Sequence, residues 1–135
     1  ALAAAALLYT PSMPASTITQ IIIGSARVQA EVADTPAERM QGLSGRQVLN
    51  EGEGMLFIFE EEGNWGFWMK DMFFPIDILW AASDGTVISI AHDVSPNTYP
   101  QAFYPTEPTA LYVLEVPAGF AKKHSIAEGE YLEFR

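Results

Sequence analysis

The sequence contains no cysteine, and this absence excludes several classes of functional site at once. Disulfide bonds, thiolate nucleophiles and zinc or iron–sulfur centres held by cysteine cannot form in this chain. Histidine is scarce as well, because only His92 and His124 are present. Two histidines so far apart in the sequence are a poor basis for a metal site. The sequence therefore predicts neither a metal ion nor a cofactor.

Positive charge is also scarce. Seven Lys and Arg residues stand against seventeen Asp and Glu residues, which gives a formal net charge of −10. A field of this sign repels the phosphate backbone of nucleic acids, so no nucleic-acid partner is expected. Apolar residues make up 49% of the chain, but no run reaches the roughly 18 residues that a membrane span needs. We expect one soluble domain with a single core.

Residues 1–16 differ in character from the rest of the chain. They read ALAAAALLYTPSMPAS, a short apolar run of small residues followed by a segment that disfavours helix. This pattern is typical of the end of a secretory signal peptide and its cleavage zone. The alternatives are a disordered leader or an N-terminal helix packed on a partner. We predict a leader at residues 1–16, a single β-rich domain at 17–135, and an extracytoplasmic location, periplasmic or secreted.

The rest of the chain consists mainly of short runs rich in β-branched and aromatic residues. Residues 18–23 and 27–32 are separated by a Gly-Ser-Ala turn and predict a hairpin. Residues 55–59 are continuously apolar, which is typical of a strand buried on both faces, and the acidic residues 60–64 are expected to form the next turn. Further strands are predicted at residues 65–70, 76–82, 86–91, 110–116 and 131–134.

Two short helices and one long loop complete this prediction. A capping residue, a proline and an early acid at residues 34–38 predict a helix through about Leu43, with a further helical turn at 46–49. Residues 117–124 predict the second helix. Four prolines between 95 and 108 exclude a central strand and indicate an ordered loop. Together these elements predict an α+β domain, mostly β, with a small barrel-like or strongly curled antiparallel or mixed sheet.

Five strings in the sequence carry a family resemblance. In order they are EVADTPAERMQGLSGR, GMLFIFE, FWMKDMFFPIDI, DGTV and LEVPAGFAKKH followed by IAEGE. They resemble the bacterial and archaeal family called domain of unknown function 192, over residues 31–134. The resemblance implies a compact, β-rich, barrel-like domain, often exported, with no established biochemical activity. The chain departs from the family pattern at Ser44, where methionine is usual, and at Met72, where threonine is usual, so no role for that threonine hydroxyl is expected here.

Candidate site residues lie in and around the segment FWMKDMFFPIDILW, residues 67–80. Alternation along the first predicted strand places Trp68 and Lys70 on one face. Asp77 lies among isoleucines and leucine in the next strand, where a carboxylate needs a cation or several hydrogen-bond donors. If these strands pair, Lys70 and Asp77 face each other across the bend between them. Arg39 and Arg46 are the alternative partners of Asp77.

Each of these residues also has a structural interpretation. Asp77 would accept backbone N–H groups of the bend, or would close an internal ion pair that fixes the strand register. Arg39 and Arg46 would share a helix face only if the helix ran unbroken; otherwise surface ion pairs with Glu38 or Glu51 are expected. Glu115 alternates with two apolar neighbours, so solvent exposure is expected unless it approaches Lys70.

Three classes of function remain open, and the sequence assigns neither a firm catalytic residue nor an oligomeric state. The leading hypothesis is a non-catalytic binding domain of the cell envelope for a small organic, saccharide or peptide ligand. Trp68, Lys70 and Asp77 would form the mouth of its site, with residues 95–108 as a lid. The second is a hydrolase or lyase with Asp77 as acid or base, assisted by Lys70 or His92, or paired with Glu115 on a glycoside. The third is a structural or protein-interaction module.

Overall fold

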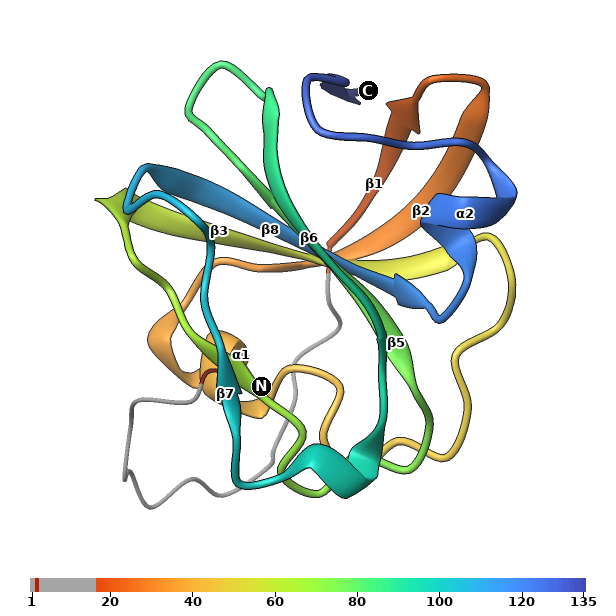
Figure 1. The fold of residues 1–135 in the computed structure, drawn as a ribbon, viewed down its shortest axis with the longest axis vertical. Helices are drawn as coiled ribbons and strands as arrows, with labels where there is room; N and C mark the ends of the chain where they lie inside the picture. Colours follow the sequence, from red (N-terminus) through yellow and green to blue (C-terminus); the bar gives the residue numbers. More distant parts are fainter. Residues whose placement is uncertain (1, 3–16) are drawn as a thin grey trace.

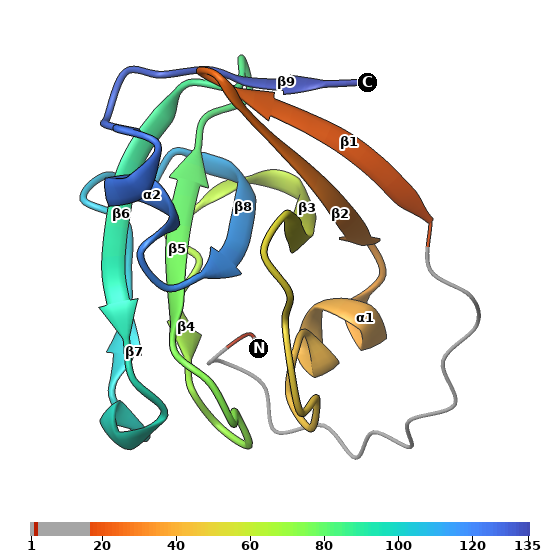
Figure 2. The ribbon, with the colours of Figure 1, turned by 90° about the vertical axis from the view of Figure 1, so that its right-hand side faces the viewer.

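The structure, a computed structural model, describes Leu2 and residues 17–135. Within these residues the strands are β1 (Ile18–Ile23), β2 (Ala26–Ala33), β3 (Glu53–Gly63), β4 (Phe67–Trp68), β5 (Ile76–Ala81), β6 (Val87–Val94), β7 (Ala102–Phe103), β8 (Ala110–Pro117) and β9 (Leu132–Phe134). Seven of them form one strongly curled sheet, a half-barrel, in the order β6-β5-β8-β3-β2-β1-β9 (Figures 1 and 2). β4 and β7 form a separate two-stranded sheet. The mostly β, strongly curled architecture predicted from the sequence is confirmed.

The N-terminal hairpin forms as predicted. β1 and β2 pair in antiparallel register, and the turn between them includes Gly24 with a φ of +56°. In β2, Val28 and Ala30 are buried while Arg27 and Gln29 are exposed, so the alternation in the sequence places one face of the strand on the core. β2 then pairs with β3 in parallel, across a connection that contains helix α1 (Pro36–Gln41).

The central strand β3 is longer than predicted. It continues through the acidic residues to Gly63, so the turn expected at 60–64 is wrong. The three glutamates are exposed and lie beyond the last regular pair with β8, at Ile58, where the register shifts before Gly63. The carboxylates therefore remain in solvent while the backbone stays extended, which an acidic run in the sequence does not reveal.

The three central strands bury both of their faces. Alternate residues of β3, β5 and β8 belong to two separate apolar clusters on opposite faces of the sheet. The α2-side cluster contains Leu79 and Leu114 and is covered by Phe120 of helix α2 (Phe120–Lys123). The β4-side cluster contains Phe57 of β3 and Phe67 of β4. Burial on both faces explains why these strands read as continuous apolar runs in the sequence.

The two predicted strands at 65–70 and 76–82 do not pair with each other. Only Phe67 and Trp68 of the first are a strand, β4, which pairs with β7 of the proline-rich segment. β5 instead lies between β6 and β8 in the large sheet. The expected approach of Lys70 to Asp77 across a shared bend is therefore not found.

Both helices are shorter than predicted. α1 begins after Thr35, which forms a capping box with Glu38, and it ends at Gly42, where φ is +49°. Residues 46–49 are not helical. α2 begins only at Phe120, because β8 continues to Pro117. None of the helices in the described part of the chain has the length and apolar character needed to span a bilayer.

Candidate binding site

Asp77 is fully buried and holds three separate segments together. Its Oδ1 accepts hydrogen bonds from the backbone N–H groups of Asp93 (2.8 Å) and Gly119 (3.2 Å). Its Oδ2 accepts one from the N–H of Ala121 at 2.9 Å. These bonds tie the end of β6 and the first turn of α2 to β5. They favour the structural interpretation of Asp77, although the donors are not in the bend that the sequence suggested.

The surface near Asp77 carries an open depression of about 540 Å³. His92 and Lys122 line it, so one of the two assisting residues of the acid–base hypothesis, His92, lies near Asp77. Asp77 itself exposes no surface, and both of its oxygens already accept backbone hydrogen bonds. It also pairs in register with Val116 of the α2-side cluster, whereas Glu115 lies on the other face of the sheet. The proposed carboxylate pair of a glycosidase is therefore not assembled.

Trp68 and Lys70 lie together, but away from Asp77. The Lys70 Nζ lies 5.9 Å from the centre of the Trp68 ring, so the two side chains share a face as predicted. The Trp68 ring also meets the ring of Tyr99 edge-on, with 5.2 Å between centroids. Lys70 is exposed. The pair is a surface cation–π contact, remote from the buried polar group with which the sequence had grouped it.

The segment predicted as a lid, residues 95–108, covers β4 rather than Asp77. It contains the 3₁₀ helix η1 (Pro96–Thr98) and β7, which pairs with β4. Tyr104 packs so closely on Gly66 that a Cβ atom at that glycine would overlap the tyrosine ring. The segment therefore supports one edge of β4 and leaves the other edge to a different neighbour.

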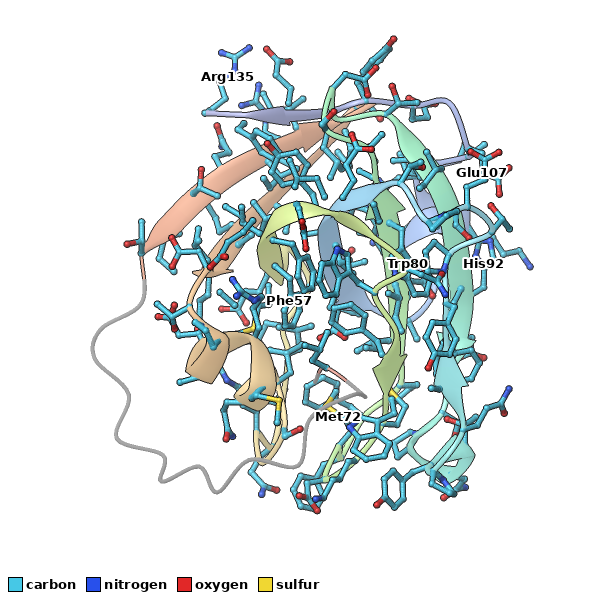
Figure 3. All side chains as sticks on the ribbon, turned by 90° about the vertical axis from the view of Figure 1, so that its left-hand side faces the viewer. Phe57, Met72, Trp80, His92, Glu107 and Arg135 are labelled. Carbon is cyan, nitrogen blue, oxygen red and sulfur yellow. The ribbon has the colours of Figure 1, made fainter. Side chains whose placement is uncertain are left out.

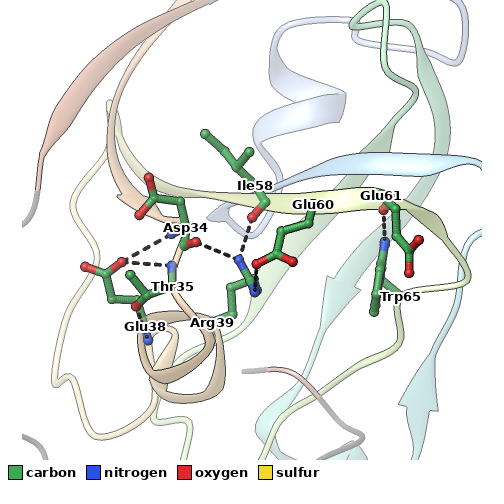
Figure 4. A network of polar contacts seen from close by, with 8 residues as sticks. All are labelled: Asp34, Thr35, Glu38, Arg39, Ile58, Glu60, Glu61 and Trp65. Carbon is green, nitrogen blue, oxygen red and sulfur yellow. Dashed lines mark hydrogen bonds and ion pairs between the residues drawn. The ribbon is translucent and has the colours of Figure 1, made fainter.

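Arg39 and Arg46 are held apart by the end of α1. Arg39 is buried, and its Nη1 donates to the backbone oxygens of Asp34 (2.8 Å) and Ile58 (2.9 Å), as Figure 4 shows. The expected surface ion pair with Glu38 or Glu51 is wrong for Arg39, whose guanidinium instead lies 3.9 Å from Glu60. Arg39 therefore fastens α1 to β3.

Arg46 makes a bidentate contact with Glu31 at 2.5 and 2.6 Å. Hydrogen bonding to this carboxylate raises the pKa of Arg46. The contact joins the segment after α1 to β2, so neither arginine approaches Asp77.

Glu115 is fully buried, which contradicts its expected exposure. It lies on β8 between Met55 of β3 and Ile78 of β5, and all three face the β4-side cluster. In the neighbouring row, Phe57 of β3 and Trp80 of β5 both pair with Val113 of β8; Figure 3 labels Phe57 and Trp80. Burial raises the pKa of the Glu115 carboxyl. The sequence shows only an alternating strand, and the second buried face of β8 comes from the fold.

The most distinctive feature beside this cluster is a groove that holds Leu2. The Leu2 backbone N–H donates to the carbonyl oxygen of Arg39 at 3.3 Å, and Leu2 forms an antiparallel β-bridge with Phe67. The Leu2 side chain packs against the β4-side cluster. A pocket of about 170 Å³ adjoins it. We call this site the α1–β4 groove; besides Phe67 it is lined by Pro36, Arg39, Met40, Phe59, Glu60, Glu61 and Trp65.

The aromatic wall of the groove is fixed by hydrogen bonds and stacking. The Trp65 ring stacks on Phe59 with 4.2 Å between centroids and 8° between planes. Its Nε1 donates to the carbonyl oxygen of Glu61 at 3.2 Å (Figure 4). Trp80 Nε1 donates in turn to the carbonyl oxygen of Trp65 at 2.8 Å. These contacts preorganise the wall, so an occupant meets a surface that is already formed.

An extended chain is the occupant that this geometry accepts best. The outer edge of β4 offers backbone hydrogen bonds, and α1 offers a carbonyl on the opposite side. Between them lies an apolar floor. This combination is the usual one for recognition by strand addition, in which the backbone gives affinity and pockets select side chains. Sequence reasoning did not identify this groove, because it placed Leu2 in the leader; residues 1 and 3–16 of that leader lie outside the described residues.

Comparisons with known proteins place the fold in an uncharacterised group. A family model for domain of unknown function 192, described as "Uncharacterized ACR", matches residues 19–134. A candidate transcription regulator from Sinorhizobium meliloti 1021 has a similar structure, with a TM-score of 0.84 and 32% identity over 91% of this chain and 98% of that one. A protein of unknown function from Novosphingobium aromaticivorans DSM 12444 has a TM-score of 0.83 and 30% identity over 97% and 94%. A search of the curated proteins found no match.

Proposed function

The chain belongs to the domain of unknown function 192 family, and because that family's description assigns no activity, we propose a function from the groove itself: the domain is a non-catalytic module that binds an extended apolar peptide segment. The observation that carries this proposal is the seating of Leu2. A residue remote in sequence bridges to Phe67, donates to the Arg39 carbonyl and packs on the β4-side cluster. Leu2 thereby makes the kind of backbone and side-chain contacts that an external peptide would make.

A peptide fits the groove better than the other ligands considered. A saccharide needs several convergent side-chain donors and acceptors, but most of the groove is formed by apolar side chains and backbone. The two glutamates at its rim, Glu60 and Glu61, are exposed. The similar protein from Sinorhizobium meliloti is described as a candidate transcription regulator, but a formal charge of −10 does not support nucleic-acid binding by this chain.

Export forms part of the proposal. If residues 1–16 are a leader that is removed in the cell envelope, its cleavage takes Leu2 away and opens the groove to other chains. If they are retained, Leu2 competes with every external peptide. The tethered segment then acts at an effective concentration in the millimolar range and weakens apparent binding.

The proposal is tested by vacating the groove in the full chain. The Leu2→Asp variant should bind a C-terminally labelled peptide with the sequence of residues 1–8 about tenfold more tightly than the unchanged protein, because the internal competitor is weakened. Fluorescence polarisation measures the dissociation constants.

The matched control is Ile18→Asp, which makes the same change at a residue that is 55% exposed and does not line the groove. It should bind as the unchanged protein does. A second probe with Asp in place of its second residue should bind neither variant. No measurable binding of the first probe to Leu2→Asp overturns the proposal.

A further inference from the structure

We infer that the α1–β4 groove selects extended peptides with two large apolar side chains two positions apart, the first in the place of Leu2 and the second in the pocket beside it. This inference rests on the proposed function and deepens it by naming the class of peptide. Two observations support it, namely the direction in which an occupant runs along β4 and the pocket that lies next to Leu2 in that direction.

The antiparallel bridge between Leu2 and Phe67 sets the direction of an occupant. A segment paired in this sense runs against β4, so the residue two positions after the bridging one lies opposite Trp65, which precedes Phe67 by two. Residues two apart in an extended chain point to the same face. The side chain at this second position therefore points, like that of Leu2, toward the β4-side cluster.

The pocket of about 170 Å³ lies at this second position. Trp65 and Phe59 line it from the side of β3 and β4, and Figure 4 shows Trp65 extending from the segment between these strands. Leu2 lines it as well, so the place of the first side chain and the pocket are adjacent. Three residues of α1 line the pocket from the helix side: Pro36, Arg39 and Met40.

The pocket suits an apolar side chain of about the size of leucine. Its lining includes the stacked rings of Trp65 and Phe59, with 4.2 Å between centroids, and the side chain of Met40. Arg39 donates its Nη1 to two backbone oxygens, and its guanidinium carbon lies 5.3 Å from the centre of the Phe59 ring. In another protein a cavity of roughly 150 Å³ binds benzene, so an aliphatic side chain has room here.

The rim of the pocket disfavours an acidic side chain. Glu60 and Glu61 line the pocket and are exposed, in a chain whose formal charge is −10. The cation in the lining, Arg39, already lies 3.9 Å from Glu60. A carboxylate at the second position would meet like charges, and such contacts count against a wrong partner. The second position therefore accepts an apolar residue and rejects aspartate.

The test uses the full chain with Leu2→Asp and peptides that are labelled at the carboxyl terminus. The parent peptide has the sequence of residues 1–8, with alanine at its third and fourth positions. Fluorescence polarisation should show about tenfold tighter binding when the fourth residue is leucine, because that side chain leaves water for the pocket. Leucine at the third position points away from the floor and should change the dissociation constant by less than about twofold. Aspartate at the fourth position should weaken binding.

The place of the second side chain is tested by Met40→Gln on the Leu2→Asp background. The amide replaces part of an apolar lining, so the preference for leucine at the fourth position should fall to about twofold or less. Lys122→Gln, which alters the depression beside Asp77, is the matched control and should keep the preference of about tenfold.

Each other outcome identifies what fails. Equal gains from leucine at the third and fourth positions, or no gain at the fourth, overturn the assignment of the pocket and leave the peptide groove standing. A preference that survives Met40→Gln unchanged places the second side chain elsewhere and overturns the assignment too. Binding of none of the peptides overturns the proposed function and this inference with it. The comparison of the peptides on Leu2→Asp remains decisive even if the Met40 variant does not fold.

Discussion

Asp77 and Glu115 are two fully buried acids on neighbouring strands, but their side chains lie on opposite faces of the sheet. Asp77 points to the α2-side face and accepts three backbone N–H groups. Glu115 points to the β4-side face between Met55 and Ile78, and burial raises its pKa. Equal burial therefore does not imply an equal role.

The difference separates an acid that joins three segments from an acid whose pKa is raised by burial. The donors around Asp77 belong to the segments it joins, so its carboxylate fastens β6 and α2 to the sheet. Glu115 lies on the face that also carries the α1–β4 groove, where an apolar residue would pack without any desolvation cost. Glu115 lies there at a desolvation cost, which appears as its raised pKa.

The largest expected effect concerns Asp77. Asp77→Ala should lower the free energy of unfolding by about 3–5 kcal/mol, because three buried backbone donors lose a charged acceptor. Urea denaturation followed by fluorescence measures the change. Glu128→Ala, which removes an exposed acid, should change stability by less than about 0.5 kcal/mol. A loss for Asp77→Ala no larger than that of the control would show that Asp77 is not structural.

The next effect is a pH dependence that belongs to Glu115. Because burial raises its pKa, the folded chain binds this proton more tightly than the unfolded chain does. Protonated Glu115 therefore makes its whole contribution to the free energy of unfolding below the ordinary pKa of a glutamate. This contribution is lost as the pH rises through the raised pKa of Glu115 in the folded chain. Unfolding free energies of wild type and Glu115→Gln, measured between about pH 4 and pH 7, should show this decline only in wild type.

The difference in unfolding free energy between wild type and Glu115→Gln can change by at most about 1.4 kcal/mol per pH unit, because a single proton is involved. Glu128→Gln serves as the control, and its difference from wild type should stay flat over the same range. A wild-type curve parallel to that of Glu115→Gln would contradict the assignment of Glu115 as a buried titrating carboxyl.

A smaller effect compares the two faces in binding. On the Leu2→Asp background, Met40→Gln should weaken binding of the peptide with the sequence of residues 1–8 about tenfold, because Met40 lines the apolar groove. Lys122→Gln alters the depression beside Asp77 on the opposite face and should leave the dissociation constant unchanged. Equal weakening by both variants would place the peptide outside the groove.

The smallest effect concerns Lys70 and Trp68, which the sequence predicted to lie on one face. Lys70→Met removes the cation above Trp68 and should cost about 0.5 kcal/mol of unfolding free energy, the usual value for an exposed cation–π contact. Peptide affinity should not change. A tenfold loss of affinity would return Lys70 to the binding site and would count against the groove.

Much of the fold was accessible from the sequence because its strands carry strong local signals. The alternation in β2, the continuous apolar runs of β3 and β5, and the proline content of residues 95–108 each predicted the correct kind of element. Boundaries were less accurate where pairing partners decided them. β3 continues through three glutamates, and β8 delays the start of α2, for reasons that lie in neighbouring strands rather than in local composition.

The candidate site was accessible only in part. Asp77 was recognised as an acid that needs donors, but its donors come from residues up to 44 positions away. Glu115 was expected in solvent because alternation in a single strand shows one buried face and cannot show that the other face is covered as well. Leu2 carries no local signal for its place in the groove, since any apolar residue in a leader would look the same.

The sequence by itself determined the excluded chemistry, the β-rich class and the apolar runs that become central strands, because these depend on residue type and on periodicity along the chain. Only the tertiary structure decided which acid accepts backbone donors, which acid lies between Met55 and Ile78 on the other face, and that Leu2 bridges to β4. These features depend on strand order and register, which bring residues far apart in sequence into contact.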